Sequence, residues 1–200
     1  MSRQVSRRPG DAAGRRGRSA GVERDLTELD TLTFELEGGD LYLLLVSPPP
    51  LVDAILALAA PLQGKRLYDL GAADGRILIR AARKGAEAVG VESHADLFRH
   101  AARRIRQLGL SDRIRLIHGD LYDAALEQAD VVMLYLDQRD CEARLVKKLL
   151  GVLRRGGRIV TVDARIPGGT PARMEEVPWG AKRYRVYLYS MSEIAGTSRM

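Results

Sequence analysis

The chain has 200 residues, of which 46% are hydrophobic and 29% are charged, a composition typical of one globular domain with a single core. Its longest uninterrupted apolar run, residues 54–60, is too short to cross a bilayer, which excludes a membrane-spanning class. One cysteine, Cys141, permits no internal disulfide and is typical of a reducing compartment. We therefore expect a cytoplasmic protein that is monomeric and has no membrane partner.

The net charge of +6 is concentrated at the N-terminus. Residues 1–20 carry six arginines against one acidic residue, a net charge of +5, so the rest of the chain carries only about +1. Segment 1–24 is rich in Gly, Ser and Arg and has few apolar side chains to bury, which predicts a disordered tail. Segment 193–200 is expected to be a short flexible tail at the other end of the chain. Nucleic acid could be contacted only through the basic tail, for which a solvated leader is the alternative interpretation.

Residues 25–60 are expected to form an N-terminal hairpin and helix that cap the fold. The pattern over 31–46, interrupted by Glu-Gly-Gly-Asp at 37–40, predicts a strand, a turn and a second strand. Ser47 and the three prolines after it then stop the second strand. Apolar spacing over 51–58 predicts a helix with prolines in its first turn, where missing N–H groups cost little.

Regular alternation of short apolar runs with helical stretches begins at Arg66. The expected strands are 66–70, 87–91, 113–118, 130–136 and 157–162, and the expected helices lie near 75–84, 94–108 and 139–154. This order implies a parallel sheet with helices on both faces. Two further expected strands, 173–177 and 184–189, have no helix between them and close the sheet. We therefore predict an α/β fold over domain 61–192: a Rossmann-like, doubly wound, seven-stranded sheet, mostly parallel with an antiparallel closing strand.

The loop after the first of these strands, "LYDLGAADGR", has the spacing of a nucleotide-binding loop. A dinucleotide fingerprint G-x-G-x-x-G would start at Gly71 and fails at Ala73 and Arg76, which disfavours NAD or FAD. The spacing acid-x-Gly-x-Gly-x-Gly fits better, because Asp69, Gly71 and Gly75 match it and only Ala73 departs. This spacing favours a ligand with an amino-acid end and an adenosine, because glycines let the backbone pass close beneath such a ligand. An alanine at position 73 is tolerable if its φ is negative.

Two more acids follow the next strands. Glu92 ends the second strand, 21 residues past Gly71, where a carboxylate can accept both ribose hydroxyls. Asp120, with Leu121 beside it, comes just after the third strand and could accept the adenine amino group. A lone acid after a strand is usually a turn residue or a helix N-cap. Because strand ends meet at one edge of a parallel sheet, Asp69 and these two acids together predict a nucleoside site.

The 25 residues "YDLGAADGRILIRAARKGAEAVGVE" resemble the glycine loop and ribose acid of the class I, seven-stranded S-adenosylmethionine-dependent methyltransferases. The closer resemblance is to the archaeal broad-specificity protein-lysine methyltransferases and to their eukaryotic relatives that methylate mitochondrial carrier and ATP-synthase subunits. It rests also on Ser-Pro-Pro at 47–49, on Gly119-Asp120 and on the closing "VYLY" at 186–189. The resemblance implies S-adenosylmethionine as cofactor and transfer of its methyl group, by in-line displacement, to an acceptor amine of a protein lysine. Three departures fall on the substrate side: Leu44, Ser47 and Val-Asp-Ala at 162–164 replace an aromatic residue, a threonine and a Ser-His pair.

A lysine acceptor must lose its proton before it can attack, and oxygen atoms must then orient its lone pair. The candidate catalytic residues are Ser47, Tyr135 and Asp137, the last two in the segment after the fourth strand. Tyr135 could cover the cofactor or line the acceptor channel, or it could be a core aromatic. Asp137 could equally be a helix N-cap. Paired with Asp163 it could bind a divalent ion, but the Asp-Asn pair of the catechol-type enzymes is not reproduced, so we expect no metal.

Two rivals to the lysine hypothesis stay open at this point. One is a small-molecule O- or N-methyltransferase. The other is a cofactor-binding protein without turnover, which the departure at Ala73 motivates. A nucleic-acid amine methyltransferase would carry an Asn/Asp-Pro-Pro-aromatic stretch after the fourth strand, and "LYLDQ" does not match it.

Overall fold

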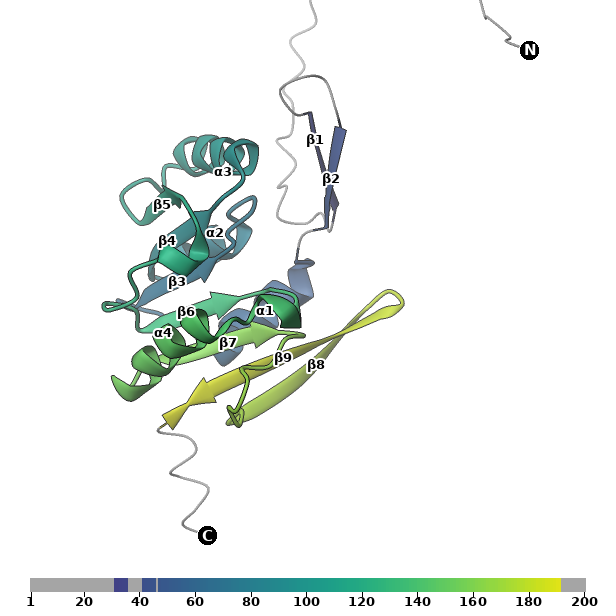
Figure 1. The fold of residues 1–200 in the computed structure, drawn as a ribbon. Helices are drawn as coiled ribbons and strands as arrows, with labels where there is room; N and C mark the ends of the chain where they lie inside the picture. The colour runs from purple at the N-terminus through teal and green to yellow at the C-terminus, as the bar shows by residue number, and fades with distance from the viewer. Residues whose placement is uncertain (1–30, 36–40, 46, 192–200) are drawn as a thin grey trace, which may run out of the picture.

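The structure contains a seven-stranded sheet flanked by helices (Figure 1). The computed structural model describes residues 31–35, 41–45 and 47–191. The strands of the sheet are β3 (Arg66–Leu70), β4 (Glu87–Glu92), β5 (Ile114–His118), β6 (Val131–Leu134), β7 (Arg158–Val162), β8 (Arg173–Trp179) and β9 (Lys182–Ser190). The helices are α1 (Pro49–Leu58), α2 (Arg76–Arg83), α3 (Ala95–Gln107) and α4 (Ala143–Arg154), with short 3-10 turns η2 (Leu121–Asp123) and η3 (Gln138–Asp140).

The strand order in the sheet is β5-β4-β3-β6-β7-β9-β8. Strand β9 runs antiparallel to both of its neighbours, and the other pairings are parallel. The predicted Rossmann-like, doubly wound sheet with an antiparallel closing strand is therefore confirmed. The chain order reverses between β3 and β6, and ligands of such sheets bind outside the carboxyl ends of the strands at this point.

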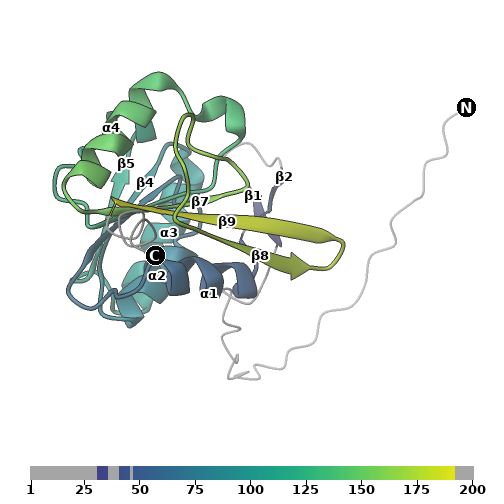
Figure 2. The same ribbon diagram turned by 90° about the horizontal axis from the view of Figure 1, so that it is seen from below.

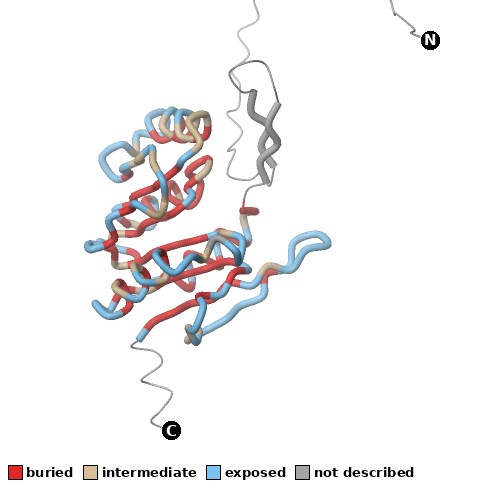
Figure 3. The backbone as a smooth tube through the Cα atoms, viewed as in Figure 1, coloured by how far each residue is buried: buried red, intermediate tan, exposed pale blue. Residues whose placement is uncertain are grey.

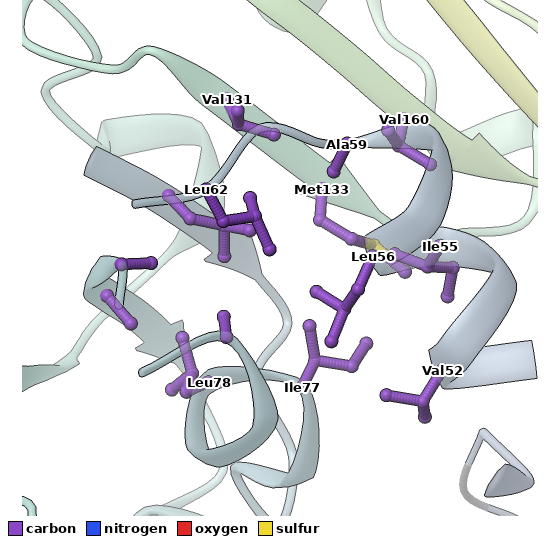
Figure 4. Close-up of a cluster of buried hydrophobic side chains, with 14 of the residues drawn as sticks. Val52, Ile55, Leu56, Ala59, Leu62, Ile77, Leu78, Val131, Met133 and Val160 are labelled. Atoms are coloured by element: carbon purple, nitrogen blue, oxygen red, sulfur yellow. The ribbon is translucent and has the colours of Figure 1, made fainter. Parts of the chain in front are cut away.

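Helices cover both faces, α1, α2 and α3 on one and α4 on the other (Figure 2). Because successive side chains of a strand point to opposite faces, a strand buried on both faces needs an unbroken apolar run. In β6, Val131 and Met133 belong to the core under α1 and α2, and Val132 and Leu134 to the core under α4. Figure 4 shows the first face, where Met133 lies beside Leu56 of α1.

The N-terminal segment contains two strands, β1 (Thr31–Glu35) and β2 (Leu41–Leu45), which pair antiparallel. Helix α1 follows it and is part of the core, with Leu51 completely buried. The predicted tails, 1–24 and 193–200, lie outside the described residues. Among the described helices, none combines the length and the hydropathy needed to span a bilayer.

Two predicted boundaries near the end of β6 differ in the structure. The strand predicted over 130–136 ends at Leu134, and the helix predicted from 139 begins only at Ala143. The cause is Asp137, whose carboxylate accepts a hydrogen bond from the Arg139 N–H and turns the chain into η3 first. As a result, residues 135–137 leave the sheet as a loop at its carboxyl edge.

The hairpin of β8 and β9 is longer than predicted and projects beyond this edge (Figure 1). Val186 lies opposite Val162, the last residue of β7, so residues 182–185 continue past the end of that strand. Gly180, with a φ of 56°, permits the tight turn that joins the two strands. Figure 3 shows the end of the hairpin as exposed, in contrast to the buried strands behind it.

Candidate active site

A cavity of about 230 Å³ lies at the carboxyl edge of the sheet, at the point where the strand order reverses. The residues predicted from the sequence that line it are Ser47, Asp69, Gly71, Ala73, Glu92 and Tyr135. They come from the segment before α1, the end of β3 and its loop, the end of β4, and the segment after β6. The fold therefore collects side chains that are far apart in the sequence around one cavity.

The glycine loop turns the chain from β3 into α2 beneath this cavity. The N–H of Gly71 donates to the Val91 carbonyl at 2.9 Å, which ties the loop to β4. Gly71 has a φ of 91° and Gly75 a φ of 77°, in the left-handed region that side chains rarely adopt. Gly75 is the N-cap of α2 and is buried, so it shapes the loop and does not line the cavity.

Ala73 does not meet the condition under which an alanine is tolerable at this position, because its φ is 48° and not negative. The cause is the closure of the loop onto β4, since the Ala73 N–H donates to a Glu92 oxygen at 2.8 Å. The alanine is thus held in a left-handed conformation in which a Cβ is unfavourable.

Ala73→Gly is expected to stabilise the fold by about 1 kcal/mol, because glycine relieves the left-handed strain but adds freedom to the unfolded chain. The matched control is Ala72→Gly, at a buried neighbour with no positive φ, which is expected to lower the stability. Denaturant unfolding of both variants measures the difference. If Ala73→Gly lowers the free energy of unfolding as much as Ala72→Gly does, Ala73 does not have a left-handed conformation.

Glu92 organises the loop. Its Oε2 accepts from the Ala73 N–H at 2.8 Å, and its Oε1 accepts from the His94 N–H at 2.8 Å. A carboxylate offers about four lone-pair positions, so roughly two remain for ligand hydroxyls. The sequence indicated a ligand contact for Glu92 but not this second task.

Asp69 is a buried acid, only 3% exposed, at the end of β3. Among the described residues, no donor lies within hydrogen-bond distance of its carboxylate. Burial raises the pKa of Asp69 well above its usual value, and the charges of Glu92 and Asp74 raise it further. A ligand ammonium at this position would supply the missing positive charge. The two carboxylates therefore fit an amino-acid end at Asp69 and ribose hydroxyls at Glu92, as S-adenosylmethionine requires.

A buried ion cluster beneath the loop was not found from the sequence. The Asp74 carboxylate accepts from Arg76 Nε at 3.0 Å and from Arg104 Nη1 at 2.6 Å, and all three side chains are at least 90% buried. Arg76 Nη1 also donates to the Ser47 carbonyl at 2.9 Å. The cluster thus links the loop to α3 and to the segment before α1. The Asp-Gly-Arg of the loop was a visible signal, but nothing marked Arg104 among the arginines of its helix.

Asp120 and Leu121 follow β5, beside the end of β4, but they do not line the cavity. Asp120 is exposed, and its Oδ1 accepts from the Tyr122 N–H at 2.8 Å as the N-cap of η2. The Gly119 N–H donates to the Glu92 carbonyl at 3.0 Å, which keeps this turn next to the cavity. The capping role is therefore observed, and a contact with adenine stays a prediction.

Tyr135 lies between two cavities. It lines the first one and also a second, of about 570 Å³, which Asp137, Asp163 and Lys182 line as well. Tyr135 is 37% exposed and follows the end of β6, so the core interpretation of this residue does not hold. Its pKa is raised, mainly by burial, so the hydroxyl keeps its proton.

The other two candidate catalytic residues occupy different places. Ser47 is buried against the first cavity. Asp137 lines only the second, where it caps η3 and pairs with Arg139 at 3.1 Å. Hydrogen bonds from Arg139 lower the pKa of Asp137. Across the described part of the chain, no group of three or more His, Cys, Asp or Glu side chains could hold a metal ion.

This sheet, with a glycine loop and acids at successive strand ends, defines a class I S-adenosylmethionine-dependent methyltransferase. A solved structure of the same fold is an RNA methyltransferase from Salinibacter ruber in complex with S-adenosyl-L-homocysteine. It is 34% identical to this chain, with a TM-score of 0.62, over 74% of this chain and 94% of that one. The cofactor of this protein is therefore S-adenosylmethionine.

Residues 69–173 match the family model of the ANTKMT methyltransferase domain, and the chain belongs to this family. A protein-lysine N-methyltransferase of Saccharolobus islandicus (strain REY15A) is 32% identical over 149 residues, 74% of this chain and 92% of that protein. A lysine N-methyltransferase of Mus musculus, named for an ATP synthase subunit, is 32% identical over 106 residues, 52% of this chain. The match spans only 42% of the mouse protein.

Proposed function

We propose that this methyltransferase transfers the methyl group to the ε-amine of a lysine side chain on a protein. The observation that carries the proposal is the second cavity, which shares Tyr135 with the cofactor cavity and is lined by Asp137 and Asp163. Hydroxyl and carboxylate oxygens are suited to bind and orient an amine. The similarity to a protein-lysine N-methyltransferase over 92% of its length supports the same acceptor.

We further propose roles for the residues around the first cavity. Asp69 would hold the cofactor ammonium, Glu92 the ribose hydroxyls, and Asp120, with Leu121, the adenine. The loop of residues 71–75 would pass beneath the amino-acid end, where backbone N–H groups can approach closely. S-adenosylmethionine supplies the methyl group as a sulfonium. The domain 61–192 would carry all of these cofactor contacts.

On the acceptor side, the chain must position an amine that has lost its proton. A lysine amine has a reference pKa near 10.4, so entry into a partly buried site beside a positive sulfonium favours loss of its proton. Ser47 and Tyr135 would orient the lone pair for in-line attack, and Arg76 would hold the Ser47 backbone in place. Asp137 would take part only at the entrance, since it lines the second cavity alone.

RNA is the second candidate acceptor, because the similar structure from Salinibacter ruber is described as an RNA methyltransferase. The segment after β6 does not supply the stretch expected for holding a flipped base, so RNA would have to bind through the basic tail.

We place the enzyme in the cytoplasm as a monomer.

The proposal is tested by label transfer from S-adenosylmethionine with a tritiated methyl group to host lysate, with Asp69→Asn as the inactive control. We expect label in discrete protein bands that is stable to base and appears as methyllysine after acid hydrolysis. Label confined to the RNA or the small-molecule fraction would overturn the lysine acceptor and keep the methyltransferase.

A further inference from the structure

The second cavity already holds a lysine of this chain. Lys182 is the first residue of β9 and therefore lies at the end of the hairpin, next to the turn that joins β8 to β9. Its Nζ donates to the Tyr135 hydroxyl at 2.8 Å and lies 3.4 Å from a carboxylate oxygen of Asp163. The side chain therefore reaches from the hairpin back to the junction of the two cavities.

Aromatic rings complete the surroundings of this ammonium. Its Nζ lies 4.2 Å from the ring centroid of Tyr184 and 5.6 Å from that of Tyr135. The two rings meet edge to face, with centroids 6.2 Å apart. A hydroxyl, a carboxylate and the ring of Tyr184 form the kind of cage that selects ammonium groups in proteins. We call Tyr135, Asp163 and Tyr184 the ammonium cage.

The backbone holds the carboxylate of this cage in an uncommon conformation. Asp163 has a φ of 59°, in the left-handed region. Two contacts with Arg185 hold it there: the Asp163 N–H donates to the Arg185 carbonyl at 2.8 Å, and the Arg185 N–H donates to Asp163 Oδ1 at 2.9 Å. The second oxygen, Oδ2, is left facing Lys182. An outlier of this kind beside a cavity points to a functional constraint.

We propose that the ammonium cage is the docking site for the amine of the acceptor, and that Lys182 occupies it as a built-in competitor which the acceptor must displace. The inference rests on the lysine acceptor proposed above. Because Tyr135 lines both cavities, an amine in the cage contacts a residue that is also a wall of the cofactor cavity.

Lys182 is suited to occupy the cage without being consumed by the reaction. Burial alone would lower its pKa, but the hydrogen bond with Tyr135 and the charge of Asp163 outweigh this and raise it. The side chain thus stays protonated in the cage, and an acceptor ammonium docked there would lose its proton only on moving from the cage toward the positive sulfonium. It is also half exposed, on a hairpin end that is not part of the core, so its departure disturbs little packing.

The test is a binding measurement that involves no methyl transfer. The probe is n-butylammonium, which reproduces the end of a lysine side chain, titrated into the full chain with S-adenosylhomocysteine while the tyrosine resonances are followed by NMR. Lys182→Met removes the competing cation, and Lys182→Ala is a second variant that removes the whole side chain. We expect both variants to bind the probe about tenfold more tightly than the unmodified protein does. This is the increase in apparent affinity expected if Lys182 leaves the cage empty about a tenth of the time and its removal leaves the cage always empty.

The matched control is Arg183→Met, which removes a charge from the next, exposed residue of the same hairpin and should leave the affinity unchanged. The proposal is overturned if neither Lys182 variant binds more tightly, or if Arg183→Met has the same effect as Lys182→Met. If the Lys182 variants bind n-butylammonium more tightly but the labelling experiment gives no methyllysine, the lysine acceptor is refuted and the cage remains as an amine-binding site. If methyllysine is found but the Lys182 variants do not bind the probe more tightly, only the cage is refuted.

Discussion

Asp69→Asn is expected to weaken binding of S-adenosylmethionine by on the order of a hundredfold, because it removes the buried carboxylate proposed to pair with the cofactor ammonium. Asparagine has nearly the same shape, so the cavity is preserved and the effect isolates the charge. The free protein should be at least as stable as before at neutral pH. The reason is that Asp69 is only 3% exposed and has no hydrogen-bond donor among the described residues.

The same carboxylate predicts a pH dependence of cofactor binding. Burial raises the pKa of Asp69 in the free protein, and a cofactor ammonium would lower it again. Binding therefore releases a proton in the range between these two values. The affinity should fall as the pH decreases through the raised pKa and should level off above it, and in Asp69→Asn this dependence should disappear.

Calorimetric titration with S-adenosylhomocysteine between acidic and neutral pH measures both effects. Asp112→Asn is the matched control, since it alters an exposed carboxylate before β5, at the opposite edge of the sheet. It should bind as tightly as the unmodified protein. Unchanged affinity in Asp69→Asn would place the cofactor ammonium elsewhere.

Asp74→Asn is expected to lower the free energy of unfolding by about 3–5 kcal/mol, as breaking a buried ion pair does. The substitution removes the carboxylate that Arg76 and Arg104 share, at 3.0 and 2.6 Å, while both guanidinium groups stay buried. The loop, α3 and the segment that carries Ser47 all meet at this cluster, so no single element can move to relieve it.

Denaturant unfolding of Asp74→Asn beside Asp53→Asn measures this difference. Asp53 also pairs with an arginine, Arg80 at 2.7 Å, but its side chain is 61% exposed. An exposed pair contributes about 0–1 kcal/mol, so this variant should unfold almost like the original protein. Equal losses in the two variants would mean that the cluster is not as buried as described.

The fold and the acids at the strand ends could be predicted from the sequence because both depend on local pattern. Apolar runs bounded by Gly and Asp predicted the strands, and their alternation with helices predicted a parallel sheet. Asp69 and Glu92 each lie at the end of such a run, so their convergence follows from the topology alone.

Other parts of the site depend on tertiary contacts that no local pattern encodes. The φ of Ala73 is determined by a hydrogen bond to Glu92, 19 residues away. Whether Arg104 faces solvent or Asp74 depends on how α3 crosses the loop. Lys182 forms a hydrogen bond with Tyr135, which is 47 residues away in the sequence. Lys182 lies in the part of the β8–β9 hairpin that extends beyond the strands predicted from the apolar pattern.

The most direct test of the site is a crystal structure of the full chain with S-adenosylhomocysteine. We predict the product ammonium within hydrogen-bond distance of the Asp69 carboxylate, the ribose hydroxyls on Glu92, and the sulfur facing Tyr135. A product bound with its ammonium on another carboxylate, or with its sulfur turned away from Tyr135, would contradict the assignment of both cavities.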